Sequence, residues 1–324
     1  MQIKQQTNLP KLVLGTMTFG EQVEKKEAIE FLTLAKSNGI ELLDSAYVYN
    51  NGRTELMLGE LLSEADFSGF SLATKVHPRI FGNLNYDSVI KQFEESLNRL
   101  AVASVDILYL HLPEPNSPIE ETLKACHELY KKGLFKRLGL SNYSVEAFSA
   151  INKICDQNGW IKPTVYQGLY NAVSRDVETE LLPFLEDNNI EFQAFNPLAG
   201  GLLAGKYSDV RKTPAAGRFS LRASYRKRYW SDDYFKAVER VKSLSESLGL
   251  PLAEAAIRWL INHSKMTTLS SSSVIIGASK VSQLEQNIKA ASGGSLPEDL
   301  IVAFDDAHRI AEPNSPSYFQ SYKA

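Results

Sequence analysis

Cysteine is scarce in this chain, and long apolar runs are missing. The 324 residues include only two cysteines, Cys126 and Cys155, and both fall in helical-looking segments with apolar neighbours. Buried, reduced thiols are the usual state of such residues, so we expect a cytoplasmic protein. The N-terminal region contains only the short apolar run 12–14, which is too brief for a signal-peptide core or a membrane span. We expect no membrane partner.

The chain also lacks a strong excess of either charge and any metal-binding spacing. Its formal net charge is −3, from 35 Lys and Arg against 38 Asp and Glu. Such a balance gives no general attraction to nucleic acid or to an anionic membrane. The five histidines form no pair with the spacing of metal ligands. We therefore expect no nucleic-acid partner and no metal.

Short apolar runs alternate with longer amphipathic stretches at intervals of roughly 30 residues, which is typical of repeated βα units. The β-branched and apolar residues in the short runs suit strands that are covered on both faces. The eight predicted strands are 11–17, 41–46, 70–76, 105–112, 135–142, 164–171, 191–198 and 272–279.

Helical periodicity marks several of the segments between these strands. Examples are 25–39, 86–100 and 118–133. Glycine, which favours the left-handed end of a helix, closes three such segments, at Gly39, Gly133 and Gly159. A further helix at 297–312 follows the eighth strand, and we expect it to pack outside the repeat.

No Gly-x-Gly-x-x-Gly motif follows any predicted strand, which argues against an open, doubly wound sheet that binds a dinucleotide. Eight βα units in a chain of this length instead predict an α/β fold with a single domain, residues 1–324. The predicted architecture is a (β/α)8 TIM barrel with an extended strand-seven loop and an extra C-terminal helix. In such barrels the chemistry gathers at the carboxyl ends of the strands.

Polar residues stand where several predicted strands end, notably Asp44, Lys75 and His111, and Tyr49 follows a few residues after the second strand. Lys75 lies in an otherwise apolar strand, and a buried ammonium is costly unless a counter-charge meets it. Asp44 on the neighbouring strand is the natural partner. A lone stabilising ion pair would explain these two residues, but it would leave Tyr49 and His111 unexplained.

A phenol has an ordinary pKa of about 10, which is too high for an efficient proton donor near neutrality. Because a nearby ammonium favours the phenolate, we expect Lys75 to lower the pKa of Tyr49 and make it a general acid. Asp44 would hold Lys75 charged, and a neutral His111 would bind and orient a carbonyl oxygen. Singly, these residues could be a helix cap, a loop aromatic or a strand histidine. Lys75 as the Schiff-base nucleophile of an aldolase-like barrel is another interpretation.

The order Asp44, Tyr49, Lys75, His111 matches the tetrad of the aldo-keto reductase superfamily, which the sequence resembles over essentially its whole length. Four stretches resemble in particular the aflatoxin-aldehyde and succinic semialdehyde reductase branch. They are YLHLPEPNSPIEETLKACHEL, LGLSNY, PTVYQGLYNAVSRDVETELLPFL and FNPLAGGLLAGKY. This resemblance implies an NADP(H)-dependent oxidoreductase that converts an aldehyde to an alcohol, and a homodimer. The similar potassium-channel β-subunits imply an alternative, a cofactor-binding regulatory module with low turnover.

The resemblance also implies where NADP(H) would bind. The nicotinamide end matches Ser141, Asn142 and Gln167. The pyrophosphate segment matches Asn196, Pro197, Leu198, Gly200, Leu202, Gly205 and Lys206. The adenosine end matches Gly277, Ser279, Gln283 and Asn287, with Arg218 as a source of positive charge. Many relatives carry an arginine at the position of Gln283, so the preference for NADPH over NADH is expected to be softer here.

The segment after the seventh predicted strand is long, since about 30 residues precede the next predicted helix, and long connections are commonly lids or binding loops. Between Asp209 and Asp232 it has no acidic residue. Its basic residues are Arg211, Lys212, Arg218, Arg222, Arg226, Lys227 and Arg228. A solvated surface loop would show the same pattern, whereas beside a barrel mouth these side chains suit an anion.

Tyr225 and Arg228 match the substrate-binding pattern of the resembled branch. That branch implies a small-molecule aldehyde with a second oxygen function, either a carboxylated aldehyde or a dialdehyde. Gln320, however, stands where the branch usually has a substrate-binding arginine. This replacement weakens the expectation of an acidic substrate.

Overall fold

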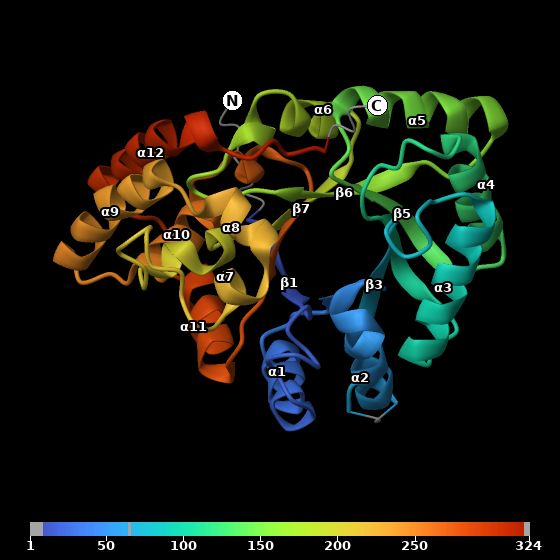
Figure 1. The fold of residues 1–324 in the computed structure, drawn as a ribbon, viewed down its shortest axis with the longest axis horizontal. Coiled ribbons are helices and arrows are strands. Elements are labelled where there is room, and N and C mark those ends of the chain that lie inside the picture. The colour runs from blue at the N-terminus through green and yellow to red at the C-terminus, as the bar shows by residue number, and fades with distance from the viewer. Residues whose placement is uncertain (1–8, 64–65, 321–324) are drawn as a thin grey trace, which may run out of the picture.

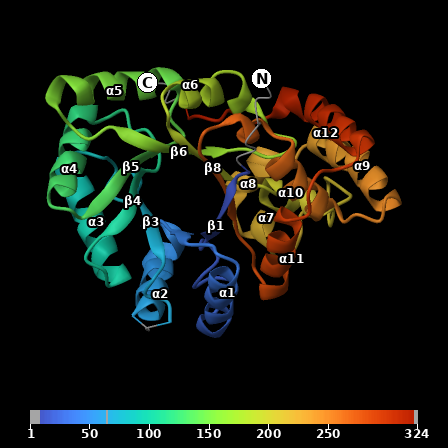
Figure 2. The same cartoon turned by 180° about the vertical axis from the view of Figure 1, so that it is seen from behind.

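The computed structural model describes residues 9–63 and 66–320. Eight parallel strands form a closed barrel in the order β1 to β8 (Figure 1, Figure 2), which confirms the predicted fold. The strands are β1 (Lys11–Gly15), β2 (Leu42–Asp44), β3 (Ser71–Val76), β4 (Val105–Leu110), β5 (Phe135–Ser141), β6 (Pro163–Leu169), β7 (Glu191–Phe195) and β8 (Ser272–Ile276). Each begins within one residue of a predicted strand.

Helices surround the barrel (Figure 1). They are α1 (Lys25–Ser37), α2 (Arg53–Leu62), α3 (Tyr86–Leu100), α4 (Ile119–Lys131), α5 (Val145–Asn158), α6 (Leu181–Asp187), α7 (Arg218–Leu221), α8 (Ala223–Tyr229), α9 (Asp232–Ser247), α10 (Leu252–Asn262), α11 (Val281–Ala291) and α12 (Glu298–Ala311). The three glycines that were predicted to end helices have positive φ angles: 69° at Gly39, 73° at Gly133 and 64° at Gly159.

Helix α3 illustrates how the sequence produces these elements. The side chain of Asn85 accepts a hydrogen bond from the backbone N–H of Ser88 at 3.0 Å and so caps the first turn. Val89, Phe93 and Leu97 follow at intervals of one turn, and all three are buried. This apolar stripe packs the helix against the barrel, while the opposite face meets solvent.

The barrel interior is filled by side chains. Ala73, Ile107, Tyr109 and Val165 form a buried cluster of their own. The ring of Tyr109 lies so close to Gly139 that an added Cβ there would stand 2.3 Å from ring atoms, so this position requires glycine. The Tyr109 hydroxyl donates a hydrogen bond to Oε1 of Gln193 at 2.9 Å. The barrel is therefore a packed core.

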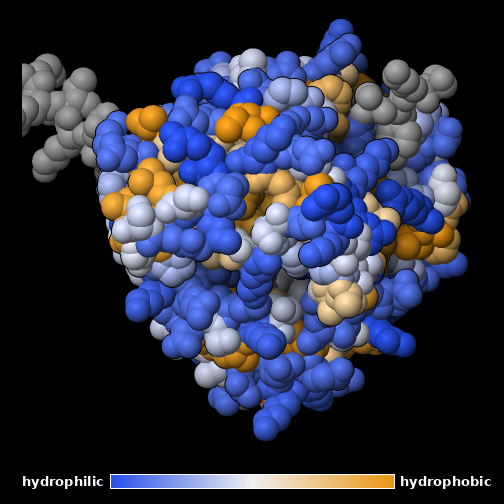
Figure 3. Space-filling model, turned by 60° about the vertical axis from the view of Figure 1, so that its left-hand side comes forward, coloured by the Kyte–Doolittle hydropathy of each residue, from blue (hydrophilic) through white to orange (hydrophobic). Residues whose placement is uncertain are grey.

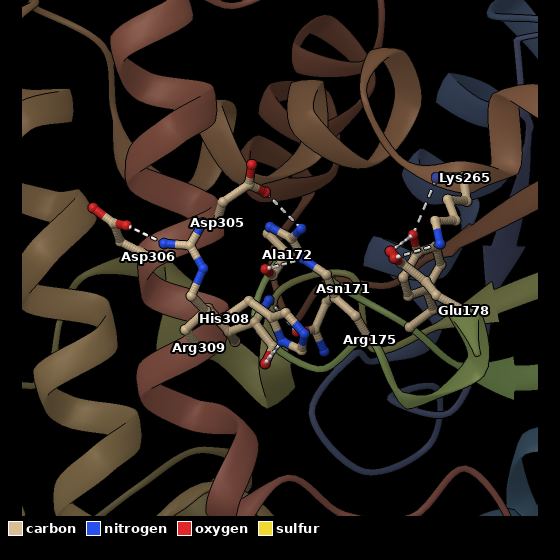
Figure 4. A network of polar contacts seen from close by, with 11 residues as sticks. Asn171, Ala172, Arg175, Glu178, Lys265, Asp305, Asp306, His308 and Arg309 are labelled. Carbon is tan, nitrogen blue, oxygen red and sulfur yellow. Dashed lines mark hydrogen bonds and ion pairs between the residues drawn. The ribbon is translucent and has the colours of Figure 1, made fainter.

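The C-terminal helix α12 packs on α9 outside the repeat, as predicted (Figure 1). Arg175, in the loop after β6, joins α12 to the barrel (Figure 4). Its guanidinium donates to Asp305 at 2.7 Å and to the carbonyl of Ala172 at 2.9 Å, and it lies 4.0 Å from the ring centroid of Trp259. These contacts connect α12 and α10 to a loop at the carboxyl end of the barrel.

The prediction of a segment without helices after β7 was wrong. A 3-10 helix, η3 (Ala199–Ala204), and the short helices α7 and α8 precede α9. They have too few turns to produce a recognisable hydrophobic period. Phe219 and Tyr229 are nevertheless fully buried, so this part of the segment packs on the barrel.

None of the described helices is both long enough and apolar enough to span a membrane. The surface that includes the side of α9 and α12 is mainly hydrophilic, with hydrophobic residues in small separate areas (Figure 3). Cys126 and Cys155 are both free and buried, as predicted. Burial raises the pKa of Cys126 to about 12 and that of Cys155 to about 11, so both thiols are protonated and unreactive at neutral pH.

Candidate active site

A cleft of about 640 Å³ opens where the loops that follow the strands meet. Most of the predicted site residues line it. They are Asp44, Tyr49, His111, Ser141, Asn142, Gln167, Asn196, Pro197, Leu198, Gly200, Lys206, Arg218, Tyr225, Arg228, Gly277, Ser279, Gln283 and Asn287. Residues that are scattered over more than 240 positions of the chain thus share one cavity.

Lys75 and Asp44 form a buried ion pair beneath this cleft. The ammonium of Lys75 is 2.7 Å from Oδ1 of Asp44, and the two side chains are 0% and 4% exposed. Lys75 also donates to the carbonyl oxygen of Ser45 at 2.6 Å, and Gln167 donates to Oδ1 of Asp44 at 2.8 Å. The parallel neighbours β2 and β3 place the two charges side by side, which confirms the predicted partnership.

Tyr49 is positioned by the turn that follows β2. Asn50 and Asn51 adopt left-handed φ angles of 49° and 56°, which asparagine tolerates better than most residues. The amide of Asn50 donates to the carbonyls of Met17 and Phe19 at 2.8 and 3.0 Å and so fixes the turn. The ring centroid of Tyr49 then lies 5.1 Å from the ammonium of Lys75.

The prediction that the pKa of Tyr49 is lowered was wrong. Burial raises this pKa well above its ordinary value, and the carboxylate of Asp44 and the phenol of Tyr225 raise it further, while Arg218 opposes them. Burial likewise lowers the pKa of Lys75, and Asp44 opposes that change. Desolvation of the phenol is therefore the largest cause of the shift, because removal from water disfavours the charged phenolate.

His111 completes the group, and its ring stands edge-to-face to that of Tyr49 at 6.1 Å between centroids. The ring of His77 is also edge-to-face to that of His111, at 4.9 Å between centroids. Burial lowers the pKa of His111 well below its ordinary value, and the charges of Lys75, His77 and Arg79 act in the same direction. His111 is therefore neutral near pH 7, as predicted.

Asparagines with left-handed backbones end β5 and β7. Asn142 has φ 66° and donates to the carbonyl oxygen of His111 at 2.9 Å. Asn196 has φ 59°, accepts a hydrogen bond from the Tyr225 hydroxyl at 3.2 Å, and donates to the Tyr229 hydroxyl at 3.3 Å. These bonds attach the helix α8 to the end of β7 and place Tyr225 in the cleft.

The segment after β7 brings backbone close to the cavity. Gly200 and Gly201 line the cleft with φ angles of 69° and 105°, and a Cβ on Gly200 would stand 2.7 Å from the ring of Tyr225. Two predicted residues of this segment do not line the cavity. The side chain of Leu202 is buried in the main core, and Gly205 ends η3 with φ 72°.

At the end of β8, Gln283 is turned toward Ser279. Its Oε1 accepts hydrogen bonds from both the backbone N–H and the hydroxyl of Ser279, each at 3.1 Å. Asn287 donates to the carbonyl of Gly277 at 3.5 Å. A neutral amide thus occupies the place where the resemblance implied a cationic side chain in many relatives.

The cleft contains further residues that the sequence analysis did not single out. They include Met17, Thr18, Gln22, Arg79, Pro251, Leu252 and Ala253. Arg222, which was noted only as part of a basic segment, bonds to Glu21 at 2.7 Å and to Asn50 at 3.0 Å. This bridge joins the segment after β7 to the loops after β1 and β2, which are not its neighbours in the barrel order.

Comparison with known proteins agrees with this geometry. The model of the Aldo/keto reductase family matches residues 11–309. Aflatoxin B1 aldehyde reductase member 2 of Mus musculus is 40% identical over 96% of this chain and 88% of its own length. Aldo-keto reductase family 7 member A3 of Homo sapiens is also 40% identical, over 96% of this chain and 97% of its own. Aflatoxin B1 aldehyde reductase member 4 of Homo sapiens is 39% identical over the same shares.

Proposed function

Because the chain belongs to the aldo/keto reductase family, we propose that it is an NADPH-dependent reductase that converts aldehydes to alcohols, with Tyr49 as the proton donor. The similarity to aflatoxin B1 aldehyde reductases supports an aldehyde substrate. The observation that carries the proposal is the convergence of Asp44, Tyr49, Lys75 and His111 at one end of one cavity.

The residues of the cleft fit a nicotinamide dinucleotide. Gly201 lines the cavity, and nothing lies within 4 Å of where its Cβ would stand, which allows close approach of phosphates to the backbone. Lys206 and Arg218 line the same cavity and would supply positive charge. Ser141, Asn142 and Gln167 present hydroxyl and amide groups at the ends of β5 and β6, and we propose that they hold the carboxamide. When bound, the dinucleotide would supply a hydride for the carbonyl carbon of the substrate.

The protein's own groups would handle the proton. Tyr49 gives its hydroxyl proton to the carbonyl oxygen as that oxygen gains negative charge, which leaves a phenolate. The ammonium of Lys75, held by Asp44, stabilises the phenolate. Neutral His111 donates a hydrogen bond to the same oxygen and orients it. The raised pKa of Tyr49 keeps the donor protonated before the reaction.

A Schiff-base role for Lys75 is disfavoured by its surroundings. Its side chain is 0% exposed and its ammonium is occupied by Asp44 and Ser45, whereas a nucleophilic amine must be reachable and unprotonated. The cytoplasmic location, the single domain over residues 1–324 and the homodimer are proposals from the sequence. The buried thiols of Cys126 and Cys155 support the first of them.

Substitution of Tyr49 by phenylalanine tests the proposal. Loss of the general acid is expected to lower kcat for NADPH oxidation with 2-carboxybenzaldehyde by about 10²- to 10⁴-fold. Quenching of protein fluorescence by NADPH should be unchanged, which would show that the cavity is intact. Full activity of Tyr49→Phe would overturn the assignment of the acid. Tight NADPH binding without turnover by the wild type, over a panel of aldehydes, would favour the regulatory module instead.

A further inference from the structure

Arg79 stands apart from the other basic residues of the cleft. It lies in the loop between β3 and α3, where its side chain is exposed and lines the cavity. Its backbone N–H donates to Nδ1 of His77 at 3.1 Å. Within residues 9–63 and 66–320, no carboxylate forms an ion pair with its guanidinium. The backbone is thus held while the charged group is free to bind a ligand.

The cleft carries more positive than negative charge. Its basic side chains are Arg79, Lys206, Arg218 and Arg228, and its one acidic side chain among the described residues is Asp44. The carboxylate of Asp44 is already neutralised by Lys75 at 2.7 Å. The cavity therefore suits ligands with several negative charges.

The four basic residues occupy two different parts of the cleft. Lys206, Arg218 and Arg228 all lie in the segment between β7 and α9, which also contains Gly201, where the proposed phosphates would lie. Arg218 donates to the Tyr225 hydroxyl at 3.2 Å. Arg79 follows β3, which lies on the other side of the barrel from β7 in the strand order (Figure 1). The proposed phosphate site therefore has three basic residues without Arg79.

Arg79 is close to the proposed site of reaction. The ring of His77, to which its backbone is bonded, packs at 4.9 Å on the ring of His111. The charge of Arg79 contributes to lowering the pKa of His111, after burial, Lys75 and His77. An anionic group bound to Arg79 would therefore lie in the same cavity as His111 and Tyr49.

We propose that Arg79 binds the carboxylate of the substrate and so selects carboxylated aldehydes over neutral ones. This inference rests on the proposed reductase function. A guanidinium forms two parallel hydrogen bonds to a carboxylate, which fixes the orientation of the bound molecule. Gln320 cannot supply this charge, and its backbone N–H bonds to the carbonyl of Asn142 at 3.0 Å on the β5 side of the mouth. On this proposal the site for the substrate carboxylate lies in the loop after β3.

The test compares 2-carboxybenzaldehyde with benzaldehyde, which differ by one carboxylate. In Arg79→Gln, the ratio of kcat/KM for the acid over that for the neutral aldehyde should fall about 10- to 100-fold, as expected for loss of a charge-assisted pair. Arg79→Lys should retain part of the ratio, because it keeps the charge but loses the fork. Arg53→Gln, which changes an exposed arginine that does not line the cleft, is the matched control and should leave the ratio unchanged. Arg228→Gln tests the residue that the resemblance assigned to substrate binding.

Each outcome decides the matter. An equal loss with both aldehydes, or a fall of the ratio in Arg228→Gln but not in Arg79→Gln, would overturn the proposal. A raised Kd for NADPH in Arg79→Gln with an unchanged ratio would assign the residue to the cofactor and overturn it as well. Failure of the wild type to reduce either aldehyde would instead refute the reductase function on which the inference depends.

Discussion

The buried pair of Asp44 and Lys75 should make the mutation Asp44→Asn strongly destabilising. The substitution leaves the Lys75 ammonium 0% exposed and without its counter-charge. Breaking a buried ion pair on one side costs about 3–5 kcal/mol. A domain of 324 residues has an unfolding entropy of roughly 0.7 kcal/mol/K, so the midpoint of thermal unfolding should fall by about 4–7 °C.

Thermal unfolding followed by circular dichroism at a fixed scan rate measures this shift. The double variant Asp44→Asn/Lys75→Met should recover at least half of the loss, because it removes the uncompensated charge. Glu60→Gln is the control, since Glu60 pairs with Lys25 at a similar 2.8 Å but both side chains are at least 50% exposed. That change should cost less than about 1 kcal/mol. Equal shifts for Asp44→Asn and Glu60→Gln would refute the reasoning.

Three other predictions concern the cofactor and pH. Gln283→Arg should raise the ratio of kcat/KM for NADPH over that for NADH about tenfold or more, because it adds one charge-assisted bond to the 2′-phosphate of NADPH. An unchanged ratio would show that the 2′-phosphate binds elsewhere. Arg222→Ala removes the bridge to Glu21 and should speed NADPH release about fivefold in stopped-flow fluorescence, since such partly exposed pairs contribute about 1 kcal/mol. An unaltered rate would show that the bridge between the segment after β7 and the loops after β1 and β2 does not retain the cofactor. Burial lowers the pKa of His77 from 6.5 to about 4, so the unfolded chain binds the extra proton first as pH falls. The free energy of unfolding should drop by about 3 kcal/mol between pH 6.5 and 4, and urea titrations of His77→Phe should show a shallower drop.

The fold was predictable because its signals are local. Each strand is a short apolar run, and in each large helix the apolar residues recur about once per turn. A short stretch of sequence is therefore enough to recognise both. The short helices α7 and α8 were not predicted, since four and seven residues are too few to show a hydrophobic period. Asp44 and Lys75 were found because polar residues at the ends of apolar strands are conspicuous.

Properties that depend on depth or on distant contacts could not be predicted in this way. The pKa of Tyr49 was assigned the wrong direction because it depends on desolvation and on groups far along the chain, such as Tyr225 and Arg218. Arg222 and Glu21 are 201 positions apart in the sequence, and neither residue alone indicates that it pairs with the other. Arg79 could be recognised as special only once its neighbours were known, because a charged loop residue is ordinary in sequence.

The packing of Tyr109 has a consequence for how protons move. Its ring lies 5.6 Å from the ammonium of Lys75 and, pressed against Gly139, fills the space on the inner side of the strands. The ammonium is also 0% exposed, so exchange of its protons with solvent requires a local opening of the packing around it. We expect a ligand that fills the mouth to oppose this opening and to slow the exchange.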